Sequence, residues 1–384
     1  MIGPVQHIAS SCFQNTLPGL LLITYVWLTS ISLAEEAAPP NNTFPGKSWE
    51  ERSSAEVGLQ ESFLVKIPEY LKGRGMIVKD GYRVFSWGDA SKAGDVASAA
   101  KPIYTHFLAH AVETGRLSSF DQKVKDIHPE LGSINAGLDH KDRQMTFAHL
   151  ATQTACYGVN EAPGSAYDYN DFQMAFFWDS LFEGVYGVEK SKVDEEVFHP
   201  LLTNPLQFED PVSMLAFGVK DRAGRLKISP RDFCRFGWLY LNEGRWGKQQ
   251  ILQPDHVRMI TQSPLPISLP RTKGVEADML PHQRSIGSRN IPDNQTDHYG
   301  SYSWLWWVNG KRAGDQRFWP DAPAGAFACL GHKHGKRGMV AIPEWNMVMS
   351  WNDTVLDKKP WPDSQTDPHP LNPVFKWISE ALKR

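Results

Sequence analysis

The sequence has few cysteines and no excess of charge of either sign. Its 384 residues include four cysteines, and 40 Lys and Arg against 43 Asp and Glu give a formal net charge of −3. Without a basic field, nucleic acid is not expected as a partner. Three cysteines follow the N-terminal region, at positions 156, 234 and 329, an odd number without close spacing. We therefore expect three buried thiols rather than a disulfide framework or a zinc site.

The motifs of several enzyme classes are also missing. The chain contains no G-x-S-x-G, no Walker loop, no G-x-G-x-x-G and no H-E-x-x-H. Hydrolases with a nucleophile elbow, P-loop proteins, dinucleotide-binding enzymes and zinc proteases therefore gain no support. His332 and His334 are close together in the sequence, but no third metal ligand stands out near them. Neither a metal nor a cofactor is expected.

Long apolar runs are scarce, and the one clear run lies near the N-terminus. Residues 17–33 are largely apolar or small, and Ser32 and Ala34 supply the small side chains that signal peptidase accepts. No Lys or Arg precedes the run. The pattern predicts a signal peptide over residues 1–34, a linker over residues 35–54, and export to the periplasm or the cell exterior. The alternative is an uncleaved N-terminal anchor, which would be the protein's only membrane contact.

Periodicity in the rest of the chain predicts strands at both ends and helices between them. Asp80-Gly81 between two apolar runs predicts a β-hairpin. Helices are expected over residues 55–71, 98–113, 170–182, 230–242 and 372–382, the last with Asn372 as its N-cap. Strands are expected over residues 301–308, 339–342 and 347–351. This order favours an α+β fold, in which an antiparallel sheet flanked by helices is built from N- and C-terminal segments and a largely helical subdomain is inserted at roughly residues 116–294.

The chain contains 14 tryptophans, of which Trp304, Trp306 and Trp307 form a close group. We expect these rings to pack in an aromatic core. The alternative is a sugar-stacking platform, which would make the protein a carbohydrate binder.

Ser98-Ala99-Ala100-Lys101 is the only S-x-x-K tetrad in the chain. It opens a predicted helix, so the side chains of Ser98 and Lys101 share one face and the amine can reach the hydroxyl. A helix N-terminus also supplies N–H groups and a positive dipole, which stabilise a developing oxyanion. Burial would lower the pKa of the Lys101 amine toward the range that a base needs at neutral pH. Ser98 is therefore a candidate nucleophile and Lys101 its candidate base, against the alternative of a solvated lysine at a helix start.

A wider pattern surrounds this tetrad. Between Gly75 and Leu117 the hairpin, Trp87-Gly88-Asp89, the tetrad and Gly115-Arg116-Leu117 follow one another. This order resembles the serine β-lactamase and penicillin-binding-protein superfamily, in particular its class C-like members and family VIII esterases. The segments 146–154 and 224–241 also resemble that family. The resemblance covers residues 55–384 and implies one β-lactamase-related serine hydrolase domain there.

The segment from Pro163 to Asp171 resembles the family's Pro-Gly segment leading into Tyr-x-Asn. Tyr169 takes the tyrosine position and, by the resemblance, a catalytic role; Tyr167 is the candidate in another register. The third residue of the motif is Asp171 instead of Asn. Its carboxylate would either favour protonated Lys101, which opposes the use of Lys101 as a base, or pair with Lys101 and orient it.

Residues 331–337 resemble the third family motif, Lys/His-Thr/Ser/Gly-Gly on an inner strand. His334-Gly335 is the preferred register, and Lys333-His334-Gly335 is the alternative. The resemblance implies that the side chain of His334 faces the substrate and that Gly335 lets the substrate approach the strand. The N–H of Lys336, just after Gly335, is then a candidate second oxyanion donor beside that of Ser98.

Together these motifs imply acyl transfer to Ser98 from a small-molecule ester, amide or peptide substrate. The proton of Ser98 would pass to Lys101, Tyr169 or both, and water would then cleave the acyl-enzyme. The superfamily includes β-lactamases, D,D-peptidases, esterases and amidases. Asp171 and the short third motif favour an esterase or amidase over a class C β-lactamase. The alternative function is a penicillin-recognising sensor or inactive homologue, which would acylate once and stop.

Overall fold

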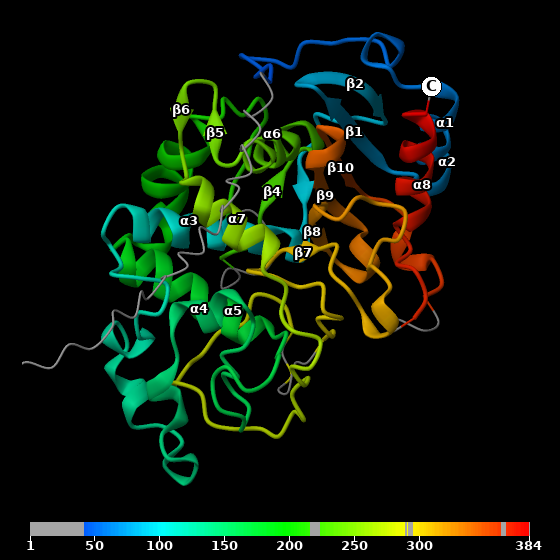
Figure 1. Ribbon diagram of the computed structural model, residues 1–384. Helices are drawn as coiled ribbons and strands as arrows, with labels where there is room; N and C mark the ends of the chain where they lie inside the picture. The colour runs from blue at the N-terminus through cyan, green and yellow to red at the C-terminus, as the bar shows by residue number, and fades with distance from the viewer. Residues whose placement is uncertain (1–41, 216–222, 289, 291–294, 362–365, 384) are drawn as a thin grey trace, which may run out of the picture. The chain divides into compact units, whose positions relative to one another are not determined.

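A six-stranded antiparallel sheet of order β2-β1-β10-β9-β8-β7 forms the centre of the fold (Figure 1). The computed structural model describes residues 42–215, 223–288, 290, 295–361 and 366–383. The strands of the sheet are β1 (Arg74–Lys79), β2 (Tyr82–Trp87), β7 (Trp307–Val308), β8 (Phe327–Gly331), β9 (Arg337–Ile342) and β10 (Met347–Asn352). N-terminal strands thus pair with C-terminal strands, and the predicted α+β class is confirmed.

The first two strands form the hairpin that Asp80-Gly81 predicts. Both turn residues have positive φ, 55° and 88°, as a two-residue turn that matches the strand twist requires. On its other side β1 pairs with β10 over its whole length, from Arg74 opposite Asn352 to Lys79 opposite Met347. This pairing joins the two ends of the described chain.

The central strands are covered on both faces. Every residue of β8 and of β10 is buried, which explains why neither strand alternates apolar and polar residues along its whole length. Helix α6 (Pro230–Leu241) packs on β1, β9 and β10, while α1 (Glu61–Leu64) and α2 (Lys66–Leu71) pack against α8 (Asn372–Ala381). Figure 1 shows α6 and α8 on opposite sides of the sheet.

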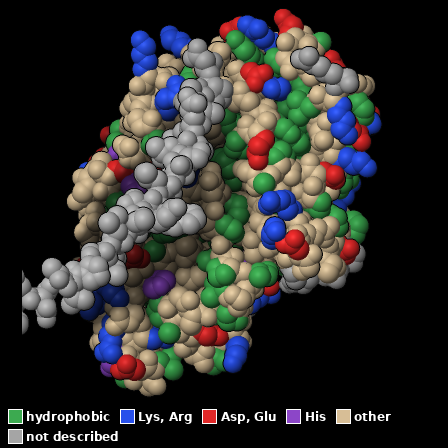
Figure 2. All heavy atoms as spheres, viewed as in Figure 1, with side chains coloured by type: hydrophobic (Ala, Val, Ile, Leu, Met, Phe, Trp, Pro, Cys, Tyr) green, Lys and Arg blue, Asp and Glu red, His purple; other side chains and the backbone are tan. Residues whose placement is uncertain are grey.

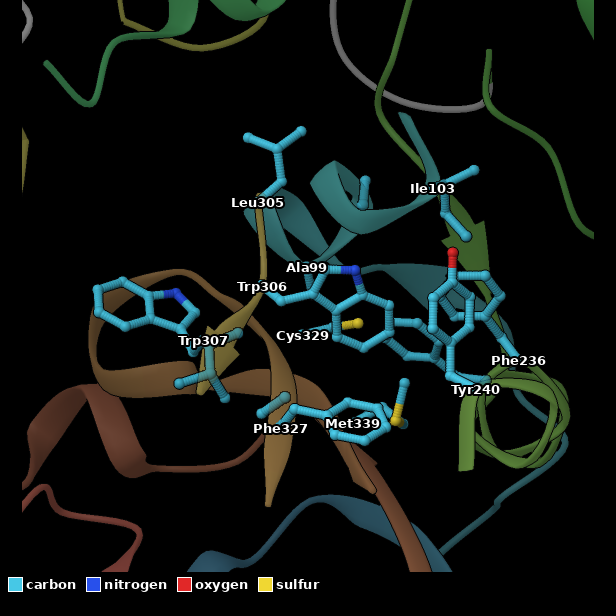
Figure 3. Close-up of a cluster of buried hydrophobic side chains, with 14 of the residues drawn as sticks. Ala99, Ile103, Phe236, Tyr240, Leu305, Trp306, Trp307, Phe327, Cys329 and Met339 are labelled. Atoms are coloured by element: carbon cyan, nitrogen blue, oxygen red, sulfur yellow. The ribbon is translucent and has the colours of Figure 1, made fainter. Parts of the chain in front are cut away.

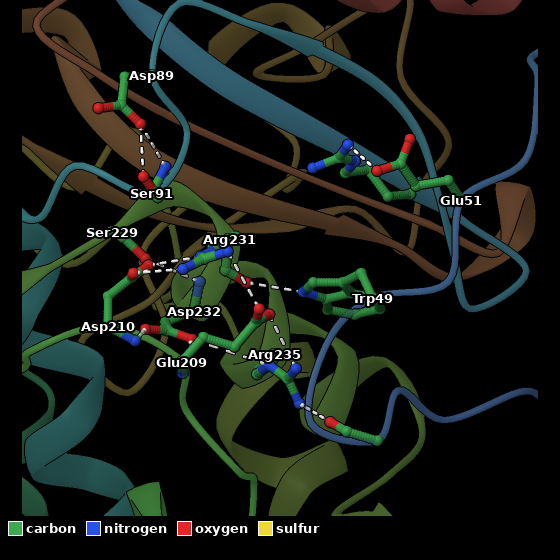
Figure 4. Close-up of polar contacts among 12 residues, drawn as sticks. Trp49, Glu51, Asp89, Ser91, Glu209, Asp210, Ser229, Arg231, Asp232 and Arg235 are labelled. Atoms are coloured by element: carbon green, nitrogen blue, oxygen red, sulfur yellow. Dashed lines mark hydrogen bonds and ion pairs between the residues drawn. The ribbon is translucent and has the colours of Figure 1, made fainter.

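Ion pairs fix the first turns of α6 to the preceding loop (Figure 4). Arg231 Nε lies 2.7 Å from Asp210 Oδ2, and Arg235 Nη2 lies 2.9 Å from Glu209 Oε1. The carboxylate of Asp232 accepts the amide N–H groups of Glu209 and Asp210 at 2.7 and 2.8 Å. Because most of these groups are buried or nearly so, the loop and the helix are held as one unit.

The region between β2 and β7 is mainly helical. It contains α3 (Lys101–Glu113), α4 (Phe147–Ala151), α5 (Asp171–Asp179), α6, α7 (Pro254–Gln262), π-helical segments at Ser180–Val185 and Asp194–Thr203, several 3-10 turns, and the short pairs β3 (Gly94–Asp95) with β4 (Lys227–Ile228) and β5 (Arg245–Trp246) with β6 (Gln249–Gln250). Most of α3 is buried. Trp306 fills the space between this region and the sheet, with its ring centroid 4.6 Å from that of Tyr240 (Figure 3).

Several predicted elements differ in detail. The helix expected over residues 55–71 is broken into three pieces, beginning with a 3-10 turn that Gly58 ends at φ 74°. Only Trp307–Val308 of the strand expected at 301–308 is a strand, because Leu305 has φ 64°. The N-cap of α8 is Leu371, and Asn372 is the first helical residue instead. Strand β8 was not predicted.

Other predictions concern the surface and the thiols. Cys156, Cys234 and Cys329 are free and buried, as predicted. Lys and Arg side chains are mixed with Asp and Glu on the face shown in Figure 2. In the described part of the chain, no helix combines the length and apolarity needed to cross a membrane. The expected leader, residues 1–34, lies outside the described residues.

Candidate active site

Ser98 lies on a 3-10 turn, Ala97–Ala100, that leads directly into α3 at Lys101. The side chain of Asp95 holds the start of this turn: its Oδ1 accepts the N–H of Ala97 at 2.8 Å. The same carboxylate pairs with Arg225 and with Arg337, whose Nη1 lies 2.8 Å from Oδ2. Burial alone would raise the pKa of Asp95, but Arg225 and Arg337 outweigh it and lower the pKa.

A continuous chain of polar contacts joins Ser98, Lys101 and Asp171. Lys101 Nζ donates to Ser98 Oγ at 3.0 Å and to Asp171 Oδ1 at 3.1 Å. The side chain of Lys101 is 1% exposed and that of Asp171 is 11% exposed. The spacing of the tetrad predicted that amine and hydroxyl could meet, and Asp171 joins them from the start of α5.

This ion pair determines the protonation states. Burial alone would lower the pKa of Lys101, but the charge of Asp171 and the neighbouring phenol of Tyr169 raise it above its ordinary value. Burial alone would raise the pKa of Asp171, but Lys101 and the hydrogen bonds to its carboxylate lower it. Lys101 is therefore an ammonium and Asp171 a carboxylate at neutral pH. Asp171 thus has both of the effects considered for it, because its carboxylate pairs with Lys101 and also favours the protonated form of Lys101.

A loop closes over the carboxylate of Asp171. Its Oδ2 accepts the N–H of Ser288 at 3.1 Å and the side-chain amide of Gln295 at 3.0 Å. Both donors lie in the connection between α7 and β7, outside any helix or strand. These bonds stabilise the charged form of Asp171 and hold it toward Lys101.

The two candidate tyrosines have different surroundings. The ring of Tyr169 lies 4.3 Å from Lys101 Nζ, and Tyr169 lines the same cavity as Ser98. Tyr167 is fully buried, with its ring against Tyr302, and burial raises its pKa well above the ordinary value. The geometry brings Tyr169, and not Tyr167, to the nucleophile.

The residues of the third motif form the turn between β8 and β9 instead of lying on an inner strand. His334 and Gly335, both with positive φ, lie in this turn and line the cavity. Burial and the charge of Lys333 lower the pKa of His334, so its imidazole is neutral at pH 7. The amide of Lys336 donates to Lys333 O at 3.3 Å, and its ammonium pairs with Asp357 at 3.0 Å.

Gly331, at the end of β8, lies directly against the turn that carries Ser98. A Cβ at Gly331 would lie 2.8 Å from Ala99 N and closer still to Val96 O. Only glycine therefore allows the end of β8 to lie against the turn that carries Ser98. Gly331 was inside the segment considered for the third motif, but its closeness to Ser98 depends on tertiary packing.

Ser98 opens into a cavity of about 1030 Å³. The cavity is also lined by Tyr169, Asp171, the cluster of Asp95, Arg225 and Arg337, the third-motif residues His334 and Gly335, and a group of aromatic side chains. Within the described residues, no group of three or more His, Cys, Asp or Glu side chains is placed to hold a metal. Asp95, Arg225, Arg337 and Gln295 were not singled out from the sequence; the one local signal was an aspartate three residues before Ser98.

Neither a protein-family model nor a curated protein matches the chain. Solved structures, in contrast, are similar to the chain in fold. A candidate 6-aminohexanoate-dimer hydrolase from Bacillus anthracis is similar with a TM-score of 0.56 and 16% identity, over 87% of each chain. A candidate β-lactamase from Bacteroides dorei DSM 17855 has a TM-score of 0.57 and 15% identity, over 88% of this chain and 100% of that chain. A penicillin-binding protein homologue from Caulobacter crescentus has a TM-score of 0.51 and 14% identity, over 88% and 99%.

The chain has the β-lactamase/transpeptidase-like fold. The resemblance of its motifs is thereby confirmed at the level of the fold. The β-lactamase/transpeptidase-like fold hosts several activities. The side chains around Ser98, and not the fold, therefore decide the function.

Proposed function

We propose that the protein is a serine hydrolase that forms an acyl-enzyme on Ser98 and hydrolyses a small ester or amide. The observation that carries this proposal is the hydroxyl of Ser98, 3.0 Å from the amine of Lys101 at the wall of a cavity of about 1030 Å³. A nucleophile, a basic group within hydrogen-bond reach and room for a substrate are the requirements of acyl transfer.

In the proposed first step, neutral Lys101 takes the proton of Ser98 while Oγ bonds to the substrate carbonyl carbon. The carbonyl electron pair moves to oxygen and returns when the alcohol or amine departs, and the leaving group takes the proton from Lys101. Water then adds to the acyl-enzyme, with its proton taken by neutral Lys101 or by the phenolate form of Tyr169, and this proton passes to Ser98 Oγ as the C–O bond breaks and the acid is released. Asp171 positions Lys101 and sets how often its neutral form occurs.

Main-chain N–H groups hold the oxyanion in this proposal. One is the amide of Ser98, because the first N–H groups of a helix lack partners within the helix. The second belongs to the end of β8 near Gly331, which lies against the turn that carries Ser98. Lys336 is the weaker candidate, since its amide already donates within the β8–β9 turn.

The test follows hydrolysis of p-nitrophenyl butyrate by the protein and by Ser98→Ala. Steady turnover that is lost in the variant supports the proposal. Activity that survives in Ser98→Ala would exclude Ser98 as the nucleophile. We also propose that residues 1–34 direct export, which cell fractionation and N-terminal sequencing of the mature protein would test.

One observation favours a second candidate function, a sensor that acylates once. The raised pKa of Lys101 leaves little neutral amine at pH 7, which slows any step that needs this base. Intact-protein mass spectrometry after mixing with a penicillin distinguishes the two functions. A persistent adduct on Ser98 without product release indicates the sensor, and catalytic release of product indicates the hydrolase.

A further inference from the structure

Five aromatic side chains form one part of the cavity lining. We name this group the aromatic wall; its members are Tyr299, Trp307, Phe318, Trp361 and His369. They come from two stretches of the chain, residues 299–318 and 361–369, and all line the cavity that also contains Ser98. The shared cavity connects the aromatic wall with the proposed nucleophile.

The rings of the wall are packed on one another, which fixes their positions. The centroids of Trp307 and Phe318 lie 5.4 Å apart at an interplanar angle of 11°, and those of Tyr299 and Phe318 lie 6.1 Å apart at 20°. Trp361 meets the group at steeper angles, with centroids 5.5 Å from Tyr299 and 4.9 Å from His369. Such preorganised rings bind a planar apolar group without the cost of ordering flexible side chains.

The backbone at β7 separates this wall from the core. Figure 3 shows Trp306 and Trp307 on opposite sides of the chain. Trp306 packs into the core against Phe236 and Tyr240, whereas Trp307 lines the cavity. The core packing expected of the tryptophans is confirmed for Trp306 and Trp307, which are both buried, and Trp307 also lines the cavity.

The charges around the wall favour a neutral guest over a cation. The guanidinium of Arg312 already lies 6.0 Å from the ring centroid of Tyr299 and 5.9 Å from that of Phe318. Burial, assisted by the charge of Arg312, lowers the pKa of His369 well below its ordinary value, so this imidazole is neutral. Among the described residues that line the cavity, both carboxylates, Asp95 and Asp171, are in ion pairs. A cation at the wall would therefore meet Arg312 and, within this described lining, no carboxylate outside an ion pair.

We infer that the aromatic wall is a subsite for a neutral aryl group, so that the protein acts on esters or amides that carry such a group on one side of the scissile bond. The reaction named in this inference rests on the proposed function, whereas the aryl ligand is inferred from the aromatic wall itself. Trp361 is the half-buried member of the wall, so its ring is the one that can be removed with the least damage to the core.

Binding is tested first in Ser98→Ala, where no turnover interferes. Isothermal titration calorimetry should show phenylacetamide binding at least tenfold more tightly than propionamide. Adding Trp361→Ala should remove most of this difference. Trp377→Ala is the matched control, because Trp377 is also half-buried, packs on Tyr70 and does not line the cavity. Equal affinity for the two amides, or tighter binding of benzyltrimethylammonium than of phenylacetamide, would overturn the inference.

Kinetics in the active protein separate this inference from the proposed function. Ethyl phenylacetate and benzyl acetate place the aryl group on the acyl and the leaving side, and ethyl acetate lacks it. At least one aryl ester should exceed ethyl acetate tenfold in kcat/KM, with the gain mainly in KM and lost in Trp361→Ala. Hydrolysis without aryl preference would refute the subsite alone. Aryl binding to Ser98→Ala with no hydrolysis by the unmodified protein would refute the reaction and leave the subsite standing.

Discussion

Lys101 and Asp171 form a buried ion pair in which Nζ lies 3.1 Å from Oδ1, and the same Nζ lies 3.0 Å from the hydroxyl of Ser98. One ammonium therefore serves two partners with opposite demands. Asp171 stabilises the protonated amine, whereas activation of Ser98 needs the neutral amine. The balance between these demands affects both the pH dependence of the activity and the pH dependence of the stability.

The activity of the proposed hydrolase should rise with pH through the neutral and alkaline range. Asp171 raises the pKa of Lys101, so the neutral amine becomes more abundant as the pH increases. In Asp171→Asn the raising charge is gone and the lowering effect of burial remains. The rise in kcat/KM should then move to lower pH by at least about one unit. The pH profiles of both proteins give the measurement, and the exposed Asp139→Asn serves as control; identical profiles for Asp171→Asn and the unmodified protein would rule out Lys101 as the titrating base.

The ion pair should stabilise the fold over a defined pH window. The lowered pKa of Asp171 makes its contribution present above about pH 3.8, the ordinary value, and lost as the pH falls. The raised pKa of Lys101 makes its contribution present below about pH 10.5 and lost as the pH rises through the higher folded value. Between these limits Lys101→Met, which leaves a buried carboxylate unpaired, should lower the free energy of unfolding by about 3–5 kcal/mol.

Urea denaturation measures this contribution across pH. The double variant Lys101→Met/Asp171→Asn should recover much of the loss, because no unpaired charge is left buried. If the single and double variants are equally unstable at pH 7, the pair does not contribute as a pair.

Gly331→Ala should impair both stability and activity. The added methyl group would lie 2.8 Å from Ala99 N, so β8 must move away from the turn that carries Ser98. A cost of about 1–3 kcal/mol in stability is expected from such overpacking. Gly137→Ala is the control, since a Cβ there meets nothing within 4 Å. Thermal melting and kcat/KM give the two readouts; an unchanged kcat/KM in a folded Gly331→Ala protein would show that this contact does not position Ser98.

Asp95→Asn should reduce kcat/KM more than it reduces stability. The amide can still accept the N–H of Ala97, but the charges of Arg225 and Arg337 lose their shared partner. These groups are partly exposed, so we expect a stability loss of about 1 kcal/mol or less. The side chain at position 95, however, loses the ion pairs that hold it in place against the turn that carries Ser98. Asp315→Asn removes the exposed partner of Lys311 and should change neither quantity. A loss of stability without any kinetic change would assign Asp95 a purely structural role.

Local patterns predicted the parts of this molecule that depend on neighbours in sequence. Asp80-Gly81 specified the hairpin, and the three-residue spacing of Ser98 and Lys101 placed their side chains on one face. The convergence of Asp95, Arg225 and Arg337 depends on the packing of β3, β4 and β9, which no local pattern contains. Strand β8 escaped prediction because it is short and buried on both faces, so it lacks the alternation that marks a strand. Leu305 shows the reverse: a residue in a strand-like run adopts a left-handed conformation, and the strand begins only after it, at Trp307.

The pairing of β1 with β10 has a consequence for synthesis and folding. Ile77 finds its partner Met349 only after the segments that supply β2 to β9 have been made. Until then β1 has one edge without its backbone partners, and closing so long a loop carries a large entropic cost. The sheet is therefore completed late, and a chain that stops before β10 exposes an apolar strand edge that can pair with other chains. The pairing of β10 with β1 thus covers an edge that could promote aggregation, in addition to completing the sheet.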